Sequence, residues 1–316
     1  MKHVIAVATL LFMFCGVGQT TQFKGEVPET IDAVMVGDRL VDVALNLGIL
    51  PKAMAVRASM WPQAEELALA SQILGCPNFV TNKKPETLAA CMLERGVTRV
   101  IIERSESFCL YKPNVNPMAA ADLVLDVPGV SIEYVDFTQG VEPAILQMAE
   151  LLGVPEKGRE LADEYARNMQ ALNESLPDEG LGKRVLILNG TYSSETGNAF
   201  VRVEAPGGYS DQYILGPLGC ENVGNELISE TMEVSKGHAG IGRITGLDQA
   251  NPDVIVATGD SLAVQMALRE AIARKPELAD VPAIKNGAVF SLPFYGDSSV
   301  VEYPGIFKQW RTALEE

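Results

Sequence analysis

Histidine is scarce in this chain, and tryptophan and cysteine are not much commoner. The 316 residues include two histidines, two tryptophans and five cysteines. Zinc and manganese sites in proteins use several imidazole and carboxylate ligands together. Beyond the first residues only His238 is left, in the Gly-rich run 236–242, where we expect it to be a surface residue of a loop. The sequence therefore predicts no dedicated metal site.

Long apolar runs are absent as well. The run at residues 4–14 has about eleven residues, which is roughly half of what crosses the hydrocarbon core of a membrane. It follows a short positive segment and precedes small residues at 16–18, as in a secretory signal. We expect residues 1–18 to be a cleaved signal peptide and the mature protein to be periplasmic. Lipid attachment at Cys15 is not favoured, because Phe14 lies where a lipobox requires a small residue.

Basic residues are too few for a polyanionic partner. There are 25 Lys and Arg residues against 41 Asp and Glu residues, and the formal charge of −16 is spread along the chain. This balance argues against nucleic acid or anionic lipid as a partner. With 47% hydrophobic residues, the chain is long enough to bury two cores, in lobes of about 130 to 150 residues each.

Catalytic motifs are missing. The sequence has no Gly-x-Ser-x-Gly elbow, no phosphate loop and no Cys-x-x-Cys pair, so we assign no catalytic residue and no cofactor. Cys76, Cys91, Cys109 and Cys220 match no metal-knuckle spacing, and whether they are oxidised stays open. An exported α/β enzyme that uses Cys109 as its nucleophile is the alternative from another functional class.

Strands and helices alternate along the chain. Short apolar strands are expected at residues 33–36, 53–56, 79–80, 99–103, 131–135, 185–188, 200–203, 254–257 and 289–292. A helix is expected to run through Leu74, a second to begin at Pro85, and others to lie around residues 211–219, 261–274 and 303–314. This alternation predicts an α/β protein with mostly parallel sheets flanked by helices.

One longer helix separates the two series of strands. An apolar stripe at helical spacing runs from Leu161 through Tyr165 and Met169 to Leu176, between Pro155 and Pro177. Such a helix is about 30 Å long, the width of a small domain. We predict an N-terminal α/β lobe at 19–154, a rigid linking helix at 155–177 and a C-terminal α/β lobe at 178–316. An ordinary long surface helix is the alternative.

Several motifs in this order resemble one known family. The first lobe carries Val-Gly-Asp-Arg-Leu-Val-Asp at 36–42, and the second carries Leu-Gly-Cys-Glu-Asn-Val at 218–223, Asn-Pro-Asp at 251–253 and Lys-Asn-Gly at 285–287. With the linking helix, the chain resembles the class III, or helical-backbone, substrate-binding proteins of ATP-binding-cassette (ABC) importers. These proteins deliver corrinoids, ferric siderophores, haem or metal ions. The resemblance implies a monomer that binds a solute between its lobes and passes it to an ABC permease.

The resemblance also implies two docking acids, one on each lobe, that meet arginines of the permease. The first matches Glu86, at the start of a helix. In the second lobe the matching place falls near Thr245, which is not an acid. Glu230, Glu233 or Asp248 could take its place, so the second docking acid is left open.

The ligand is expected beyond the carboxyl ends of the strands, where the loops of a parallel sheet form a crevice. Phe108 and Phe294 lie in these loops. The candidate ligand-binding residues from the same loops are Arg57, Met60, Trp61, Arg104, Tyr111, Tyr192 and Tyr295. Aromatic rings and guanidinium groups together suit a bulky anionic metal chelate, such as a corrinoid, a ferric siderophore or a haem-like compound. A small oxyanion, molybdate or tungstate, is the alternative, because backbone amides at helix starts could hold it.

Overall fold

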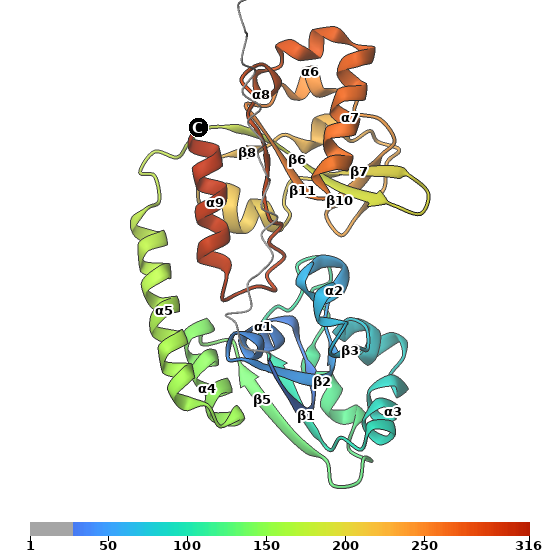
Figure 1. Ribbon diagram of the computed structural model, residues 1–316, viewed down its shortest axis with the longest axis vertical. Coiled ribbons are helices and arrows are strands. Elements are labelled where there is room, and N and C mark those ends of the chain that lie inside the picture. Colours follow the sequence, from blue (N-terminus) through green and yellow to red (C-terminus); the bar gives the residue numbers. More distant parts are fainter. Residues whose placement is uncertain (1–27) are drawn as a thin grey trace, which may run out of the picture.

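Two sheets form the centres of two lobes, and one long helix runs along the side of both (Figure 1). The computed structural model describes residues 28–316. The predicted signal peptide at 1–18 and Cys15 lie outside the described residues. Within residues 28–316, no helix has the length and apolar character needed to cross a membrane.

Twelve strands are defined in this part of the chain. They are β1 (Glu29–Val36), β2 (Ile49–Ala55), β3 (Gln72–Ile73), β4 (Arg99–Arg104), β5 (Ser131–Asp136), β6 (Arg184–Ser193), β7 (Asn198–Glu204), β8 (Glu221–Asn222), β9 (Val234–Ser235), β10 (His238–Ile241), β11 (Val254–Gly259) and β12 (Val289–Ser291).

Helices connect most of these strands. The α-helices are α1 (Asp38–Asn46), α2 (Gln63–Leu67), α3 (Glu86–Arg95), α4 (Val141–Leu152), α5 (Pro155–Glu174), α6 (Leu247–Ala250), α7 (Ser261–Arg274), α8 (Pro282–Lys285) and α9 (Tyr303–Glu315). Short 3₁₀ or π-helical turns are η1 (Ala58–Met60), η2 (Phe79–Lys83), η3 (Pro117–Leu123), η4 (Asp211–Leu215), η5 (Gly224–Leu227) and η6 (Pro276–Asp280).

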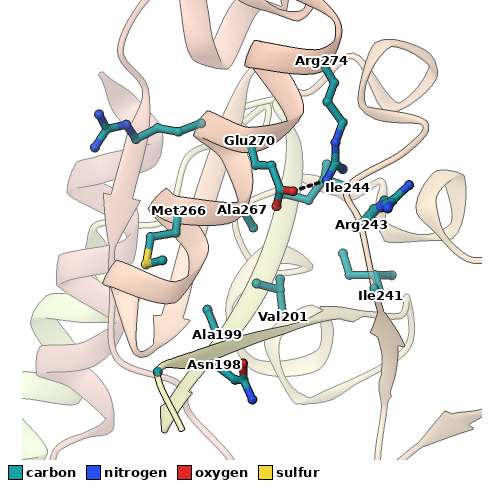
Figure 2. Close-up of a pocket in the computed structure, with 13 residues that line it drawn as sticks. Asn198, Ala199, Val201, Ile241, Arg243, Ile244, Met266, Ala267, Glu270 and Arg274 are labelled. Carbon is teal, nitrogen blue, oxygen red and sulfur yellow. Dashed lines mark hydrogen bonds and ion pairs between the residues drawn. The ribbon is translucent and has the colours of Figure 1, made fainter. Parts of the chain in front are cut away.

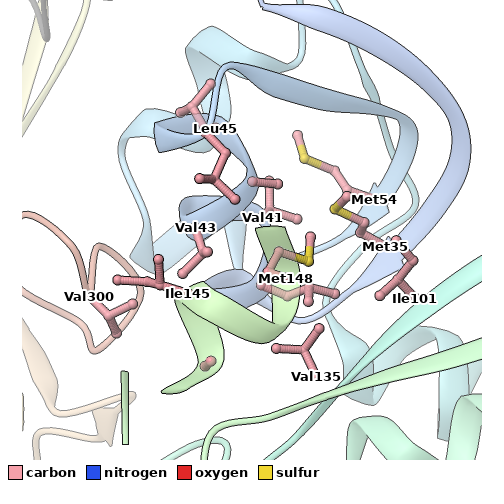
Figure 3. Packing of buried hydrophobic residues seen from close by; sticks show 14 of the residues in the cluster. Met35, Val41, Val43, Leu45, Met54, Ile101, Val135, Ile145, Met148 and Val300 are labelled. Carbon is pink, nitrogen blue, oxygen red and sulfur yellow. The ribbon is translucent and has the colours of Figure 1, made fainter. Parts of the chain in front are cut away.

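The first sheet is parallel throughout, in the order β3-β2-β1-β4-β5. Successive side chains of β1 point to opposite faces, so Met35 packs in the core under α1 and α4 while Val34 packs under α3. Figure 3 shows the first of these cores, where Ile145 and Met148 of α4 meet the α1 side chains. Burial on both faces explains why the strands of this lobe are apolar at nearly every position.

The second sheet is mixed, in the order β12-β11-β6-β7-β10-β9, with β8 also paired to β6. Strands β12, β11, β6 and β8 are parallel, whereas β7, β10 and β9 extend the sheet in antiparallel pairing. Helix α7 covers one face and α9 the other. The predicted α/β class with two helix-flanked sheets is confirmed. The antiparallel extension was not predicted, because the Gly-rich run 236–242 has little of the β-branched content typical of strands.

Two local predictions were wrong. Residues 79–80 belong to the π-helical turn η2 rather than to a strand, since a pair of apolar residues is too short to show a period. The helix expected to run through Leu74 ends at Leu67, and β3 follows it. Both errors lie at the edge of the first sheet, so the order of its central strands is not affected.

The linking helix α5 begins at Pro155 and ends at Glu174, close to the predicted range. It packs against α4 of the first lobe and α9 of the second (Figure 1). Gly153 ends α4 in the left-handed region, at φ 72°, which lets α5 turn back along α4. The division into separate domains at residues 155 and 178 stays a prediction.

Gly158 sets how closely α5 approaches α4. A Cβ added there would overlap the Cβ of Ala149. Alanine normally stabilises a helix by up to about 1 kcal/mol relative to glycine. Overpacking costs more, so we expect Gly158→Ala to lower the free energy of unfolding by about 1 to 3 kcal/mol.

Urea unfolding of the purified protein measures this effect. Ala149→Gly in the same chain removes the overlapping methyl group, so the double variant should be more stable than Gly158→Ala alone. If Ala149→Gly only adds its own destabilisation, the close approach of α4 and α5 is not the cause.

Candidate ligand site at the lobe interface

A buried carboxylate, Asp38, organises the line where the two lobes meet. It begins α1 directly after β1 and has no exposed surface. Its oxygens accept hydrogen bonds from the backbone N–H of Arg57 (2.8 Å), from Arg57 Nε (2.5 Å) and from Ser298 Oγ (2.7 Å). Arg57 follows β2 in the first lobe, whereas Ser298 follows β12 in the second. A single carboxylate therefore holds groups from both lobes.

Arg57 extends this contact into the second lobe. Its Nη1 donates to the hydroxyl of Tyr209 (2.7 Å), and its Nη2 donates to the carbonyl of Asp297 (3.1 Å) and to Ser298 Oγ (3.2 Å). The guanidinium group also lies 4.6 Å from the centre of the Phe108 ring. Only 4% of Arg57 is exposed. We call the contact zone around Asp38 and Arg57 the seam.

Residues 296–302, which we call the strap, form the last part of the connection from β12 to α9 and cross the seam. Trp61 Nε1 donates to Ser299 Oγ of the strap (2.9 Å). Val300 is buried in the core of the first lobe, beside Ile145 of α4 (Figure 3). The second lobe therefore contributes a side chain to the hydrophobic core of the first.

Tyr111 crosses the seam in the opposite direction. Its ring meets the ring of Tyr209 edge to face, with the centres 5.2 Å apart. A Cβ added at Gly208 would lie 2.8 Å from the Tyr111 hydroxyl, and one added at Gly237 would overlap it. Two glycines of the second lobe thus make the slot that accepts this side chain.

The seam carries more acids than bases. Besides Asp38, the acids Glu103 and Asp297 lie against Arg39, with Arg39 Nε 3.0 Å from Glu103 Oε1 and Arg39 Nη2 3.5 Å from Asp297 Oδ2. Glu103 is fully buried, and neither of its oxygens accepts a well-directed hydrogen bond. Burial raises the pKa of Glu103 to about 7, although Arg39 opposes the shift. Burial also raises the pKa of Asp297, against the effect of Arg39 and Arg57.

One face of the antiparallel extension is polar and aromatic. The pairing of β6, β7 and β10 sets Thr191 opposite Phe200, Asn189 opposite Arg202 and His238 opposite Glu204, and residues paired in this way share a face. Arg202 is exposed, and its Nη2 donates to Asn189 Oδ1 (2.9 Å). We call this surface the β7 face.

His238 is not the surface loop residue that the sequence suggested. It belongs to β10, and 11% of its side chain is exposed. Its Nε2 lies 3.9 Å from Glu204 Oε2 and has no hydrogen-bond partner, and its ring lies 5.8 Å from that of Phe294. Burial lowers the pKa of His238. The imidazole therefore forms part of the β7 face in its neutral form.

The first lobe approaches this face through η1. Lys236, in the turn before β10, donates from Nζ to Ser59 Oγ across the two lobes (2.8 Å). Met60 follows Ser59 and is partly exposed. A Cβ added at Gly296 of the strap would lie 2.9 Å from the Met60 carbonyl. Ser59 and Met60 are therefore the parts of the first lobe that adjoin the second at this end of the seam.

The seven predicted ligand residues divide into two groups. Arg57, Trp61 and Tyr295 are at most 4% exposed, and Arg57 and Trp61, with the partly buried Tyr111, make the contacts of the seam. Met60, Arg104 and Tyr192 reach the surface, and Arg104 lies 3.8 Å from Asp136. A role of any of the seven in ligand binding stays a prediction.

The register explains which residues were missed. Tyr192 of β6 lies on the same face of the sheet as Ala199 and Val201 of β7. Arg202 and Phe200 lie on the opposite face. The sequence Phe-Val-Arg-Val-Glu at 200–204 alternates in a period of two, and Val201 and Val203 are buried. This alternation already placed Arg202 on the outward face, so it was the signal that could have found it.

A groove of about 460 Å³ lies elsewhere on the second lobe, between α7 and the other face of β7 (Figure 2). Its floor is apolar, with Val201, Ile241 and Ile244, and an ion pair between Arg274 and Glu270 spans one wall. None of the predicted ligand residues lines it. Size alone therefore does not make this groove the site, because only one lobe builds it.

The other predicted positions are simple to place. Glu86 is the first residue of α3, and 68% of its side chain is exposed, 4.0 Å from Lys84 Nζ. All four cysteines of the described chain are free thiols, and burial raises the pKa of Cys91 and Cys220. Residues 28–316 contain no group of three or more His, Cys, Asp or Glu side chains placed to hold a metal ion.

Comparison with known proteins decides the family. The sequence profile described as "Periplasmic binding protein" matches residues 119–295, just over half of the 316 residues. The chain belongs to this family. The family is one of binding proteins rather than enzymes. No curated protein matches the sequence of this periplasmic binding protein.

Solved structures confirm the fold of this binding protein. The apo form of the heme-binding protein RhuT from Roseiflexus sp. RS-1 is 15% identical with a TM-score of 0.55, and covers 91% of this chain and 99% of its own. The heme-binding protein HutB of Vibrio cholerae is 18% identical with a TM-score of 0.52, at 90% and 98% coverage. The siderophore binding protein from the fuscachelin gene cluster of Thermobifida fusca is 12% identical with a TM-score of 0.52, at 92% and 98% coverage.

The raised pKa of Glu103 predicts how stability depends on pH. The ordinary pKa is 4.5 and burial raises it to about 7, so the folded protein holds this proton more tightly than the unfolded chain does. The stabilisation is therefore complete below about pH 4.5 and is lost as the pH rises through about 7. Relative to Glu103→Gln, wild-type stability should fall by about 2 to 3 kcal/mol between pH 5 and pH 8.

Urea unfolding of both proteins at several pH values measures this difference. Glu204 is also buried with a pKa of about 7, so both chains will share the part of the pH dependence that Glu204 causes. Only the difference between the two curves reports on Glu103. Parallel curves from pH 5 to pH 8 would show that Glu103 does not hold a proton at the seam.

Proposed function

We propose that this periplasmic binding protein captures a metal chelate, of the corrinoid, ferric-siderophore or haem type, beside its seam and delivers it to an ABC permease. The observation that carries the proposal is the β7 face of the second lobe, whose strand β10 follows a turn that contacts Ser59 of the first lobe through Lys236. Both lobes thus contribute to one surface, in a fold shared with heme-binding and siderophore-binding proteins.

The chemistry of the β7 face suits such a ligand. Phe200 is 58% exposed and offers a ring for contact with a flat or bulky group. Arg202 is held in place by Asn189 and still presents its guanidinium group to solvent, where it can bind a peripheral carboxylate in a bidentate way. The predicted Met60 follows Ser59 in the first lobe, is partly exposed and can adapt to an irregular ligand surface.

The buried members of the predicted set act indirectly in this proposal. Arg57, Trp61 and Tyr111 fix the distance between the lobes, because each fills a partner site across the seam. With α5 packed along both lobes, the ligand surface is largely formed before binding. We therefore expect the lobes to move little when the ligand binds.

Arg202 gives the first test. Purified protein is titrated with haemin, a ferric siderophore and cyanocobalamin, and binding is followed by visible absorbance. We expect one class to bind with one ligand per chain. Arg202→Gln should then weaken that binding by about ten- to a hundredfold, since a charged hydrogen bond contributes about 1.5 to 3 kcal/mol.

Arg243→Gln is the matched control, because Arg243 is an exposed arginine that lines the groove beside α7 instead. Weaker binding in Arg243→Gln with unchanged binding in Arg202→Gln would move the site to that groove. Absence of binding by all three chelate classes would count against the proposed function.

Glu86 gives the second test, through its proposed contact with the permease. In proteoliposomes that contain the importer, Glu86→Arg should abolish ligand uptake while the affinity of the binding protein for its ligand stays unchanged. Glu94→Arg is the control, since Glu94 is an exposed acid on the same helix. Equal loss of uptake in both variants, or loss of ligand affinity in Glu86→Arg, would refute the docking role.

A further inference from the structure

A second cavity lies at the side of the seam that faces the linking helix. Its volume is about 170 Å³. Its walls include Arg39 and Phe137 of the first lobe, Tyr165 of α5, and Tyr213, Tyr295, Asp297 and Tyr303 of the second lobe. None of the residues of the β7 face lines it. The cavity is therefore distinct from the proposed chelate site.

Aromatic rings make up much of the cavity wall. The ring centres of Tyr213 and Tyr295 are 5.2 Å apart, those of Tyr295 and Tyr303 are 4.8 Å apart, and those of Tyr213 and Tyr303 are 6.1 Å apart. Tyr165 and Phe137 add two further rings from other elements. A ring attracts a cation at its negative face, whereas its edge is positive, so only the ring faces that border the cavity suit a cation.

Two of the tyrosine hydroxyls have no protein partner. Tyr303 donates its hydroxyl hydrogen to the carbonyl of Tyr213 (2.8 Å). In contrast, neither Tyr165 nor Tyr295 forms a hydrogen bond through its hydroxyl to any residue in 28–316, and Tyr295 is only 3% exposed. These two hydroxyl groups can therefore form hydrogen bonds to an occupant of the cavity or to water.

The carboxylate of Asp297 lines the same cavity. Asp297 has φ 57°, a left-handed conformation that few residues other than glycine, asparagine and aspartate adopt. Its partner Arg39 is shared, because Arg39 also contacts Glu103 (3.0 Å) and donates to the Ser107 carbonyl (2.7 Å). The left-handed backbone of the strap thus positions the Asp297 carboxylate, whose charge Arg39 only partly neutralises.

Further acids lie near the cavity. Asp38, Glu103 and Asp297 face the two arginines, Arg39 and Arg57. Beneath the strap, Asp42 Oδ2 accepts from the backbone N–H of Val301 (3.0 Å), and burial raises the pKa of Asp42, with the neighbouring Glu302 adding to the shift. Burial raises the pKa of Glu103 and of Asp42, so neither adds a full negative charge, and Asp297 is the carboxylate of the cavity wall that an added cation would contact.

We propose that this cavity binds a small organic cation of the quaternary ammonium class, held by cation–π contacts with the tyrosine rings and by the carboxylate of Asp297. The size agrees, since a cavity of about 150 Å³ holds a molecule the size of benzene. A trimethylammonium group with a short polar arm fits, whereas a metal chelate does not. Because the walls come from both lobes and α5, the occupant stabilises their assembly.

The test compares choline with 3,3-dimethylbutan-1-ol, a neutral molecule of nearly the same shape. Isothermal titration calorimetry uses the full mature chain at constant ionic strength. We expect choline to bind at least about tenfold more tightly than the alcohol, because only choline carries the charge. Equal affinity for the two compounds, or no binding of choline, would overturn the proposal.

Variants of Tyr165 separate the ring from its hydroxyl, and Tyr165 lies on α5, where it is only partly buried. Tyr165→Phe keeps the ring and should keep choline affinity within about threefold, whereas Tyr165→Leu should lose about fivefold or more. Wild-type affinity in Tyr165→Leu contradicts the cation–π contact.

Asp297→Asn tests the charge independently and should weaken choline binding by about tenfold. The melting temperature of each variant without choline shows whether it is folded. Where Asp297→Asn is unfolded, Tyr303→Leu on α9 replaces it, with loss of choline affinity expected and unchanged affinity contradicting the site. Chelate binding at the β7 face is measured in the same variants, so failure of this proposal is distinct from failure of the proposed function.

Discussion

The ion pair between Asp38 and Arg57 is the constraint on which the two-lobed arrangement depends. A buried pair of this kind is stable only when every remaining donor and acceptor also has a partner. Asp38 receives its third hydrogen bond from the strap, and Arg57 reaches its other acceptors on Tyr209 and Asp297. The second lobe both covers these groups and supplies their remaining hydrogen-bond partners.

This requirement shapes where function can be located. The centre of the seam is filled by Tyr111, Trp61 and the strap, so bulky compounds are restricted to its edges. The two edges differ in chemistry. The β7 face combines an exposed guanidinium group with an exposed ring, whereas the cavity beside α5 combines tyrosine rings with the ion pair of Asp297 and Arg39. The two proposals therefore place an anionic ligand and a cationic ligand on either side of the same contact.

The sequence predicted the helices and strands better than it predicted which side chains contact each other. The α/β alternation and α5 followed from apolar periodicity, which burial imposes directly, as in Leu161, Tyr165 and Met169. The loops after β1 and β2 were predicted to line a ligand crevice, and in the structure they carry Asp38 and Arg57 of the seam. Whether Arg57 faces ligand or a protein carboxylate could not be predicted, because its acceptors Tyr209 and Asp297 lie 152 and 240 residues further along the chain. Arg202 could have been predicted as an outward-facing residue, because the alternation of residues 200–204 identified its face.

The strap has a consequence for how the protein is made. A chain that emerges N-terminus first completes the strands and helices of the first lobe while residues 296–302 are still to come. Until then Val300 is missing from the core beside Ile145, and Asp38 lacks the Ser298 hydroxyl. The core of the first lobe is therefore complete only when the final part of the polypeptide is in place.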